Sequence, residues 1–191
     1  MLQISRSVWL VFMLLASLFI AGCAGPAPNY APSIDNVEAL KKSGIAPSNV
    51  GAVTVTADLP GGKILSLRAN TMVSPVGANF GDYIAMALRQ ELELAKLFYA
   101  QSGLEISGAL LRNNIDAGGI SSNEGQIEAR FVVKRGGQVR FDKVKRIEHK
   151  WESSFAGAVA IPLAANNYPV MVQKLIGSLL ADPEFIQSLR N

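Results

Sequence analysis

The N-terminal segment constrains this chain most, because it decides which residues take part in folding at all. Arg6 supplies one positive charge, and the stretch from Val8 to Ile20 is apolar apart from Ser17. A basic start, a short apolar run and small residues at its end are typical of a secretory signal peptide. The run is shorter than the roughly 20 apolar residues that a membrane span needs. We therefore expect residues 1–22 to be cleaved as a signal peptide.

The segment ends in Ile20-Ala21-Gly22-Cys23, which resembles the lipobox of bacterial lipoproteins. The resemblance implies cleavage before Cys23, a diacylglycerol on its sulfur and an acyl chain on its new amino group. Cys23 is the only cysteine, so it has no disulfide partner within the chain, and a lone thiol is a liability in an oxidising compartment. Several acyl chains make such an attachment effectively permanent. The alternative is an ordinary signal peptide, cut after Ala21 or Ala24, with Cys23 as an incidental thiol.

The residue after the cysteine is Ala24 and not aspartate. By resemblance to the sorting pattern of enteric-type bacteria, this implies a protein that is lipid-anchored in the outer membrane and faces the periplasm, given a Gram-negative source. The net charge of +3 at pH 7 is too small to indicate binding of nucleic acid. The expected partners are the membrane, through the lipid anchor, and a protein of the cell envelope.

Residues 23–33 are expected to form the lipidated cysteine and a proline-rich tether. Prolines at 26, 28 and 32 and the lack of apolar periodicity predict a segment that does not fold by itself. Extended at about 3.1 Å per residue, the tether would hold the domain roughly 30 Å from the lipid headgroups. Residues 34–191 are then expected to form a single periplasmic domain, which is long enough for a substantial core.

Alternating apolar residues and turn sequences predict strands at residues 50–56, 63–68, 104–111, 127–134 and 138–154. The first two are expected to form a hairpin through residues 58–62, and residues 113–124 are expected to be a polar loop. Gly136-Gly137 predicts a two-residue turn between the last two strands, and a bulge is expected near Asp142. Trp151 and Phe155 are expected to face the core.

Helical periodicity predicts helices at residues 34–43 after Ser33, at 79–99, from Asn167 onward, and after Asp182. Glu91 and Glu93 lie two positions apart on the second of these helices and point in different directions, so we expect both to be solvated. Residues 155–165 are small and apolar. They indicate either a membrane contact or a connector packed under the final helix, and Pro162 favours the connector.

This order of elements predicts an α+β fold. We expect a two-layer sandwich in which an antiparallel sheet of about four to five strands carries two main helices on one face. The lipobox, the proline-rich segment, the long helix, the three-strand meander ending at Trp151 to Phe155 and the final Asp-Pro-Glu-Phe helix resemble the YajG-type family of small Gram-negative lipoproteins. More loosely, the chain is similar to the auxiliary lipoproteins of envelope transport systems. The resemblance implies a fold and a location more than an activity.

The residues give little support for catalysis. His149, the only histidine, lies mid-strand between Glu148 and Lys150. A metal site needs three or four ligands, and the sequence has no cluster of histidines and cysteines. A Ser-His-Asp arrangement depends on partners that meet only in the fold, but no Gly-x-Ser-x-Gly motif is present, and no glycine pair belongs to a phosphate-binding motif. We expect no enzyme, no catalytic residue, no cofactor and no metal.

Basic residues are concentrated in one predicted hairpin. They are Lys134, Arg135, Arg140, Lys143, Lys145, Arg146 and Lys150. They indicate either a patch for an anionic partner or a solvated sheet edge whose charges prevent aggregation, and the second interpretation is favoured.

Three functions stay open at this point. The first is a noncatalytic binding or accessory module of the cell envelope, for example an auxiliary of transport or surface assembly. The second is an envelope hydrolase acting on cell wall or lipid, with a site assembled from scattered residues and His149. The third is a protein that binds anionic lipid through the basic hairpin. The anchor and the missing catalytic motifs favour the first.

Overall fold

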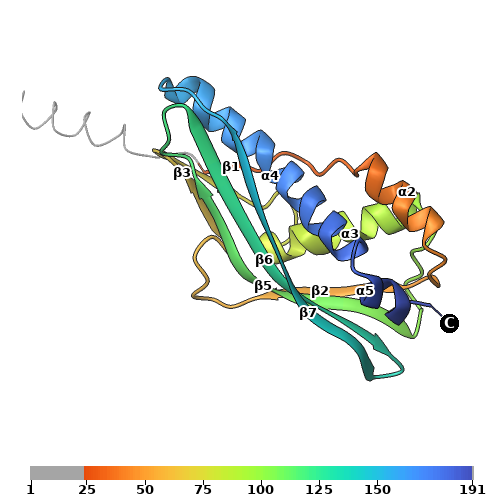
Figure 1. Cartoon of the computed structure of the whole chain (residues 1–191). Helices are drawn as coiled ribbons and strands as arrows, with labels where there is room; N and C mark the ends of the chain where they lie inside the picture. The colour runs from red at the N-terminus through yellow and green to blue at the C-terminus, as the bar shows by residue number, and fades with distance from the viewer. Residues whose placement is uncertain (1–23, 191) are drawn as a thin grey trace, which may run out of the picture.

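The structure is a computed structural model that describes residues 24–190 (Figure 1). Cys23 and the expected cleavage site lie outside the described residues. The fold is α+β, as the sequence predicts. Two sheets form it together with the helices α2 (Ile34–Lys42), α3 (Phe80–Leu94), α4 (Gly157–Leu180) and α5 (Pro183–Ser188).

The main sheet has four strands in the order β2-β5-β6-β7. Their bounds are Asn49–Val55 for β2, Leu104–Asp116 for β5, Ser122–Arg135 for β6 and Gln138–Glu152 for β7. β5, β6 and β7 form the predicted antiparallel meander, but β2 pairs with β5 in parallel, so the sheet is mixed. A parallel pair needs a long crossover, and the chain between β2 and β5 supplies it through α3.

The prediction of a hairpin between residues 50–56 and 63–68 is wrong. β3 (Ile64–Leu67) lies in a separate three-stranded sheet, in the order β1-β4-β3. It reverses directly into β4 (Asn70–Val73), a strand that the sequence analysis missed, and Leu67 pairs with Asn70. Arg68, in the turn, takes a left-handed backbone conformation with φ of 58°. Such short reversals require a positive φ, and an arginine in the sequence does not indicate that conformation.

The loop expected at residues 113–124 is shorter than predicted, because β5 continues to Asp116 and β6 begins at Ser122. The Gly136-Gly137 turn is confirmed, with φ of 54° and 84°. The bulge lies slightly before its expected place. Val133 pairs with Phe141 and Lys134 with Val139, so Arg140 is the extra residue.

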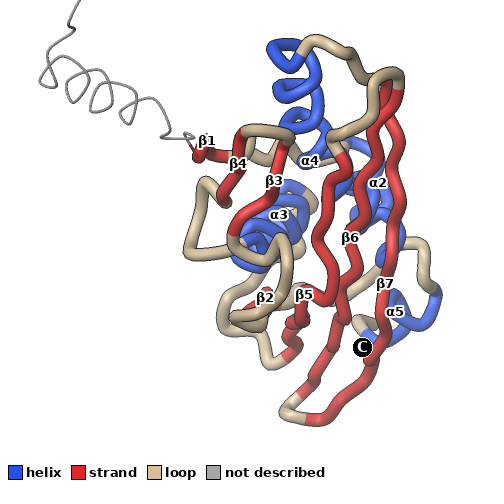
Figure 2. Tube along the Cα trace, turned by 90° about the vertical axis from the view of Figure 1, so that its left-hand side faces the viewer, coloured by secondary structure: helices blue, strands red, loops and turns tan. Residues whose placement is uncertain are grey.

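The two main helices cover the same face of the main sheet, as predicted (Figures 1 and 2). α3 packs against β2, and α4 packs against β6 and β7. The approach of α3 is close, because a Cβ added at Gly81 would lie 2.1 Å from the carbonyl oxygen of Val53. The smaller α2 packs against α3 and α4.

Local capping explains where most helices begin. The side chains of Ser33, Asn79 and Asp182 accept hydrogen bonds from backbone N–H groups in the first turns of α2, α3 and α5. α3 ends at Leu94 and not at Tyr99, and Lys96 beyond it has φ of 61°.

The start of α4 differs from the prediction. The helix begins at Gly157 and not after Asn167, so residues 155–165 are not a connector. Pro162 lies inside this helix. A proline has no backbone N–H, so the carbonyl of Ala158 loses its usual partner in the helix. Ala158 is an exposed residue, and water can therefore satisfy that carbonyl at little cost. Phe155, expected in the core, is 81% exposed.

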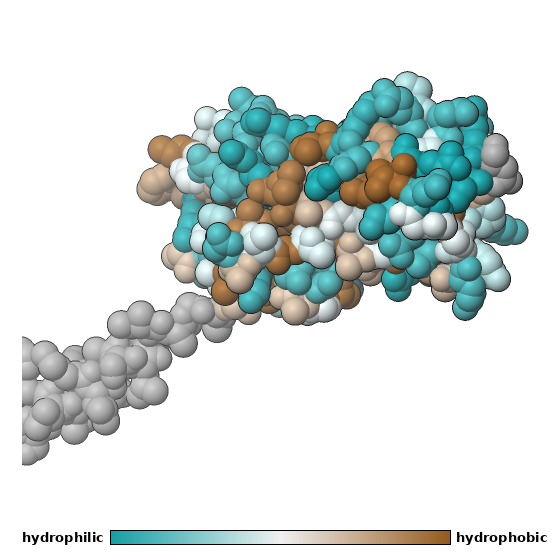
Figure 3. Space-filling view, turned by 90° about the horizontal axis from the view of Figure 1, so that it is seen from below, coloured by the Kyte–Doolittle hydropathy of each residue, from teal (hydrophilic) through white to brown (hydrophobic). Residues whose placement is uncertain are grey.

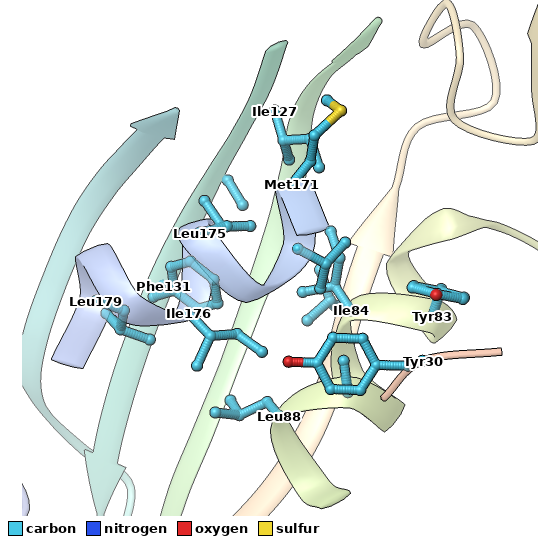
Figure 4. Packing of buried hydrophobic residues seen from close by; sticks show 14 of the residues in the cluster. Tyr30, Tyr83, Ile84, Leu88, Ile127, Phe131, Met171, Leu175, Ile176 and Leu179 are labelled. Carbon is cyan, nitrogen blue, oxygen red and sulfur yellow. The ribbon is translucent and has the colours of Figure 1, made fainter. Parts of the chain in front are cut away.

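The core lies between the helices and the main sheet. Figure 4 shows side chains of α3, α4 and β6 that share one interior, among them Ile84, Leu88, Ile127, Phe131, Leu175, Ile176 and Leu179. An aromatic group extends this interior towards the N-terminal segment: the ring centroids of Phe80 and Tyr168 are 4.8 Å apart and those of Tyr83 and Tyr168 are 5.4 Å apart.

Candidate functional site

The segment after Cys23 is built into the domain. β1 (Ala24–Pro26) pairs in parallel with Thr71–Val73 of β4, and Ala27 N donates to the Val73 carbonyl at 2.8 Å. Ala27 and Tyr30 are buried. The prediction of a free tether over residues 23–33 is therefore wrong for its described part, residues 24–33. Prolines do not prevent this docking, because a short edge strand needs few backbone donors.

A buried carboxyl group holds the next part of the segment. Glu91 of α3 is 0% exposed, which corrects the expectation that it is solvated, whereas Glu93 is exposed as expected. Oε1 of Glu91 accepts from the Tyr30 hydroxyl, from Nδ2 of Asn36 at 3.1 Å and from the backbone N–H of Ser33 at 3.2 Å. Burial raises the pKa of Glu91, although these donors oppose the effect. The carboxyl thus connects α3 to the N-terminal segment.

Two further hydrogen bonds fix the same segment. The Tyr83 hydroxyl donates to the Pro28 carbonyl at 2.8 Å, and the Gln173 side chain of α4 donates to the Ala31 carbonyl at 2.7 Å. Burial raises the pKa of the Tyr83 hydroxyl, which therefore stays a donor. The N-terminal segment is thus fastened to both main helices, and the residue that follows Cys23 has a fixed place on the domain.

Arg68 organises the end of the domain at which the chain enters. From the β3–β4 turn its guanidinium donates to the carbonyl oxygens of Ala117 at 2.7 Å, Gly119 at 2.9 Å and Ser154 at 2.8 Å. A fourth contact reaches the carbonyl of Phe155 at 3.1 Å. One side chain therefore joins the small sheet, the β5–β6 loop and the β7–α4 loop. Arg68 was not predicted as a site residue, because its acceptors are backbone carbonyls, which leave no pattern in a sequence.

The basic residues of the β6–β7 hairpin do not form one patch. Lys143 and Lys145 lie on the helix-covered side of β7, in the same alternation as Phe141 and Ile147. Both pair with Asp182, the N-cap of α5, at 3.4 and 2.6 Å. The Lys145 contact is the main reason that the pKa of Asp182 is lowered to about 2.

Three more basic residues of the predicted patch bind an acidic side chain or a backbone carbonyl. Arg146 pairs with Glu148 at 2.8 Å, Lys150 pairs with Glu124 at 3.3 Å, and Arg135 donates to the Arg190 carbonyl at 2.8 Å. Within residues 24–190, no ion pair involves Lys134 or Arg140, which lie near the tip of the hairpin. Only the tip therefore keeps uncompensated positive charge.

His149 bridges β7 and α4. Its Nε2 lies 2.9 Å from Oδ1 of Asn167, and its Nδ1 lies 2.8 Å from Nζ of Lys174. Burial is the main reason that the pKa of His149 is lowered, and the neighbouring ammonium adds to the effect. A neutral imidazole fits both contacts, with Nε2–H donating to the amide oxygen and Nδ1 accepting from the lysine. The partners of His149 are an amide and an ammonium group, not a serine and a carboxylate.

A groove lies between β3 and β5. It has a volume of about 420 Å³ and is lined by residues such as Leu59, Ile64, Leu65, Arg112 and Asn113. Arg112 is its one charged lining residue, so this groove offers no pair of carboxylates. Among residues 24–190 there is also no group of three or more His, Cys, Asp or Glu side chains that could hold a metal ion. None of the helices in that range combines the length and the hydropathy of a membrane span.

Figure 3 views the molecule from the underside of Figure 1. That surface is largely hydrophilic and is interrupted by separate hydrophobic patches. No single feature on this face identifies a ligand.

No family model matches the chain, and no curated protein matches it. Solved structures do resemble it. One is the crystal structure of a Xanthomonas campestris protein of the family DUF330, with a TM-score of 0.53 and 13% sequence identity over 83% of this chain and 95% of the other. At this identity the likeness concerns the fold alone, and it supports the α+β architecture along nearly the whole described chain.

Proposed function

We propose that this protein is a lipoprotein anchored in the outer membrane and facing the periplasm, where it acts as a noncatalytic binding or accessory module of the cell envelope. The observation that carries the proposal is the lipobox-like Ile20-Ala21-Gly22-Cys23, followed at once by a strand that is fixed to the domain. An anchor at Cys23 would hold the folded body directly at the membrane. A role in transport or in surface assembly fits such a placement.

The two ends of the fold suit different roles, one for the membrane anchor and the other for a partner. The chain enters at the end that carries β1, whereas the tip of the β6–β7 hairpin lies at the opposite end in both views (Figures 1 and 2). A body anchored through Cys23 therefore directs this tip away from the membrane. Lys134, Arg140 and the 56% exposed Val139 lie beside the Gly136-Gly137 turn, and they suit an acidic protein surface with an apolar centre.

The anchor is tested by mass spectrometry of the native mature N-terminus. We expect the first residue to be Cys23 with diacylglyceryl and acyl groups, and Cys23→Ser to carry neither group. An unmodified N-terminus at any other residue would overturn the envelope assignment.

The binding role is tested by photo-crosslinking in living cells. A photo-reactive residue at Val139 should give one defined crosslinked envelope protein, and Lys134→Glu with Arg140→Glu should abolish that product. A photo-reactive residue at Leu94, which is 56% exposed on α3, serves as the matched control. Crosslinks that are equal at both positions, or absent at Val139, would count against a partner at the hairpin tip.

A further inference from the structure

Four large apolar side chains protrude at the end of the domain where the chain enters. They are Ile120, Phe155, Val159 and Leu163, which are 67%, 81%, 50% and 37% exposed. We call this group the apolar rim. Val159 and Leu163 are four positions apart on α4, and they therefore lie on one side of the helix. Clusters of exposed apolar side chains in soluble domains mark interaction sites.

The parts that carry the apolar rim are held side by side. Ile120 belongs to the β5–β6 loop and Phe155 to the β7–α4 loop. The backbone N–H of Ser153 donates to the Ser121 carbonyl at 2.9 Å, and the guanidinium of Arg68 binds carbonyls of both loops. The apolar rim is therefore a fixed surface of the fold and not a set of independent side chains.

The same guanidinium ties the apolar rim to the point where the chain enters. Ala24 pairs with Thr71, close to Arg68 in the β3–β4 hairpin, and Arg68 contacts the carbonyl of Phe155. In Figures 1 and 2, β1 and the start of α4 lie at the same end of the molecule. No residue separates Cys23 from this pinned strand. Lipid chains on Cys23 would thus enter the bilayer next to the apolar rim.

The chemistry of this end also suits the membrane interface. No charged residue occurs from Ser153 to Gln173, which includes the exposed first turns of α4. Ala156 precedes α4 where the other described helices begin with a polar capping side chain. When a helix lies on a membrane, its apolar face is buried about 5–10 Å deep at the boundary between lipid headgroups and acyl chains.

We propose that the apolar rim is a second membrane contact, which inserts its side chains into the bilayer that holds the lipid anchor. The occupant is therefore a phospholipid surface, and the proposal rests on acylation of Cys23 as part of the proposed function. The two contacts together fix the orientation of the domain, since a lipid anchor alone leaves rotation about its attachment point free. The β6–β7 hairpin tip is then held at a constant height above the membrane.

The test uses the mature acylated protein in vesicles of phosphatidylethanolamine and phosphatidylglycerol. Because acylation blocks the sulfur of Cys23, a Phe155→Cys variant carries one free thiol, which is labelled with an environment-sensitive fluorophore. We expect blue-shifted emission and several-fold lower access to a water-soluble quencher than for the same label on Leu94→Cys. Equal access at the two positions would overturn the proposal.

A second measurement separates the apolar rim from the anchor. The mature chain with Cys23→Ser is mixed with the same vesicles, and the bound fraction is measured by sedimentation. Each apolar side chain that leaves the membrane lowers the partition coefficient by about tenfold, so Phe155→Ser should weaken binding by that factor. Leu94→Ser is the matched control and should leave binding unchanged. Binding that does not respond to Phe155→Ser would contradict the proposal.

Two other outcomes have distinct meanings. If the label at residue 155 is shielded without vesicles and in proportion to protein concentration, the occupant is a second copy of this chain and the membrane contact is wrong. If mass spectrometry finds no lipid on Cys23, the proposed anchor fails. The sedimentation result with Cys23→Ser then still decides whether the apolar rim binds lipid.

Discussion

The hydroxyl of Tyr30 donates a hydrogen bond to Oε1 of Glu91, which joins the segment after the expected lipid attachment site to the last turn of α3. Both side chains are buried, so neither group can exchange its partner for water at low cost. The contact turns an expected spacer into part of the folded body. Removing the hydroxyl alone also provides a direct way to loosen that segment while the buried ring of Tyr30 stays in place.

Tyr30→Phe should release the N-terminal segment. The ring still packs, but Oε1 of Glu91 loses one of its three donors, and a single hydrogen bond contributes about 0.5–1.5 kcal/mol. We expect that loss of free energy of unfolding in urea, with faster amide hydrogen exchange confined to residues 24–33. Tyr99→Phe is the control, because Tyr99 is 54% exposed. Unchanged exchange in the segment would show that the hydroxyl does not hold it.

Glu91→Gln should change how stability depends on pH. Burial raises the pKa of Glu91 above its ordinary value of 4.5, so the carboxyl binds its proton more tightly in the folded protein than in the unfolded chain. The stability that this group contributes is complete below the ordinary value and is lost as pH rises through the raised pKa. The free energy of unfolding of the wild type should therefore fall relative to Glu91→Gln as pH increases above 4.5.

The control for this experiment is Glu93→Gln, since Glu93 is exposed on the same helix. Its stability should follow that of the wild type at each pH. A constant difference between wild type and Glu91→Gln across the range would mean that the carboxyl does not titrate differently on folding.

How well the sequence predicts the structure depends on the range of the interactions. Ser33 and Asp182 were identified as caps because a cap and its acceptor N–H lie within one helical turn. The hairpin at Gly136-Gly137 is equally local, because glycine permits the positive φ that the turn needs. The α+β class follows from such local patterns taken together.

The site residues were harder to predict, because their partners are distant in sequence. Glu91 is buried only because Tyr30 and Asn36 are brought to it from the N-terminal segment. β1 exists only because β4 offers it an edge, and no periodicity is visible in a strand of three residues. The basic residues were located correctly, but their acidic partners on α5 could not be inferred without the fold.

Asp182→Asn should lower stability without removing the helix cap, since asparagine caps helices as well as aspartate does. The lysine contacts hold the pKa of Asp182 at about 2, below its ordinary value of 3.8. The stabilisation is therefore present above the ordinary value and is lost as pH falls through about 2. The Asp182 side chain is only 8% exposed, but its partners Lys143 and Lys145 are 38% and 17% exposed. Water therefore reaches the ammonium groups and weakens the pairs, so we expect a loss of only about 1 kcal/mol at neutral pH.

This difference between wild type and Asp182→Asn should disappear in acid, as measured by urea unfolding at several pH values. Glu184→Gln is the control, because Glu184 contacts Lys143 but its side chain is 71% exposed. A loss that persists unchanged at low pH would assign the effect of Asp182→Asn to packing and not to charge.

Arg68 should tolerate glycine better than alanine. Both Arg68→Gly and Arg68→Ala remove the hydrogen bonds to the β5–β6 and β7–α4 loops, and hydrogen bonds of charged groups contribute about 1.5–3 kcal/mol. Alanine must also adopt the positive φ of this turn, which costs about 1 kcal/mol more than for glycine. We therefore expect both variants to be destabilised, and Arg68→Ala to be the less stable one by that amount.

The rates of proteolysis and of hydrogen exchange should increase at residues 117–121 and 153–156 in both variants, whereas the rates at the β6–β7 hairpin tip should not change. Equal stability of the two variants would mean that the turn changes its conformation once the guanidinium is gone. In that case Arg68 itself imposes the left-handed backbone through the carbonyls that it binds.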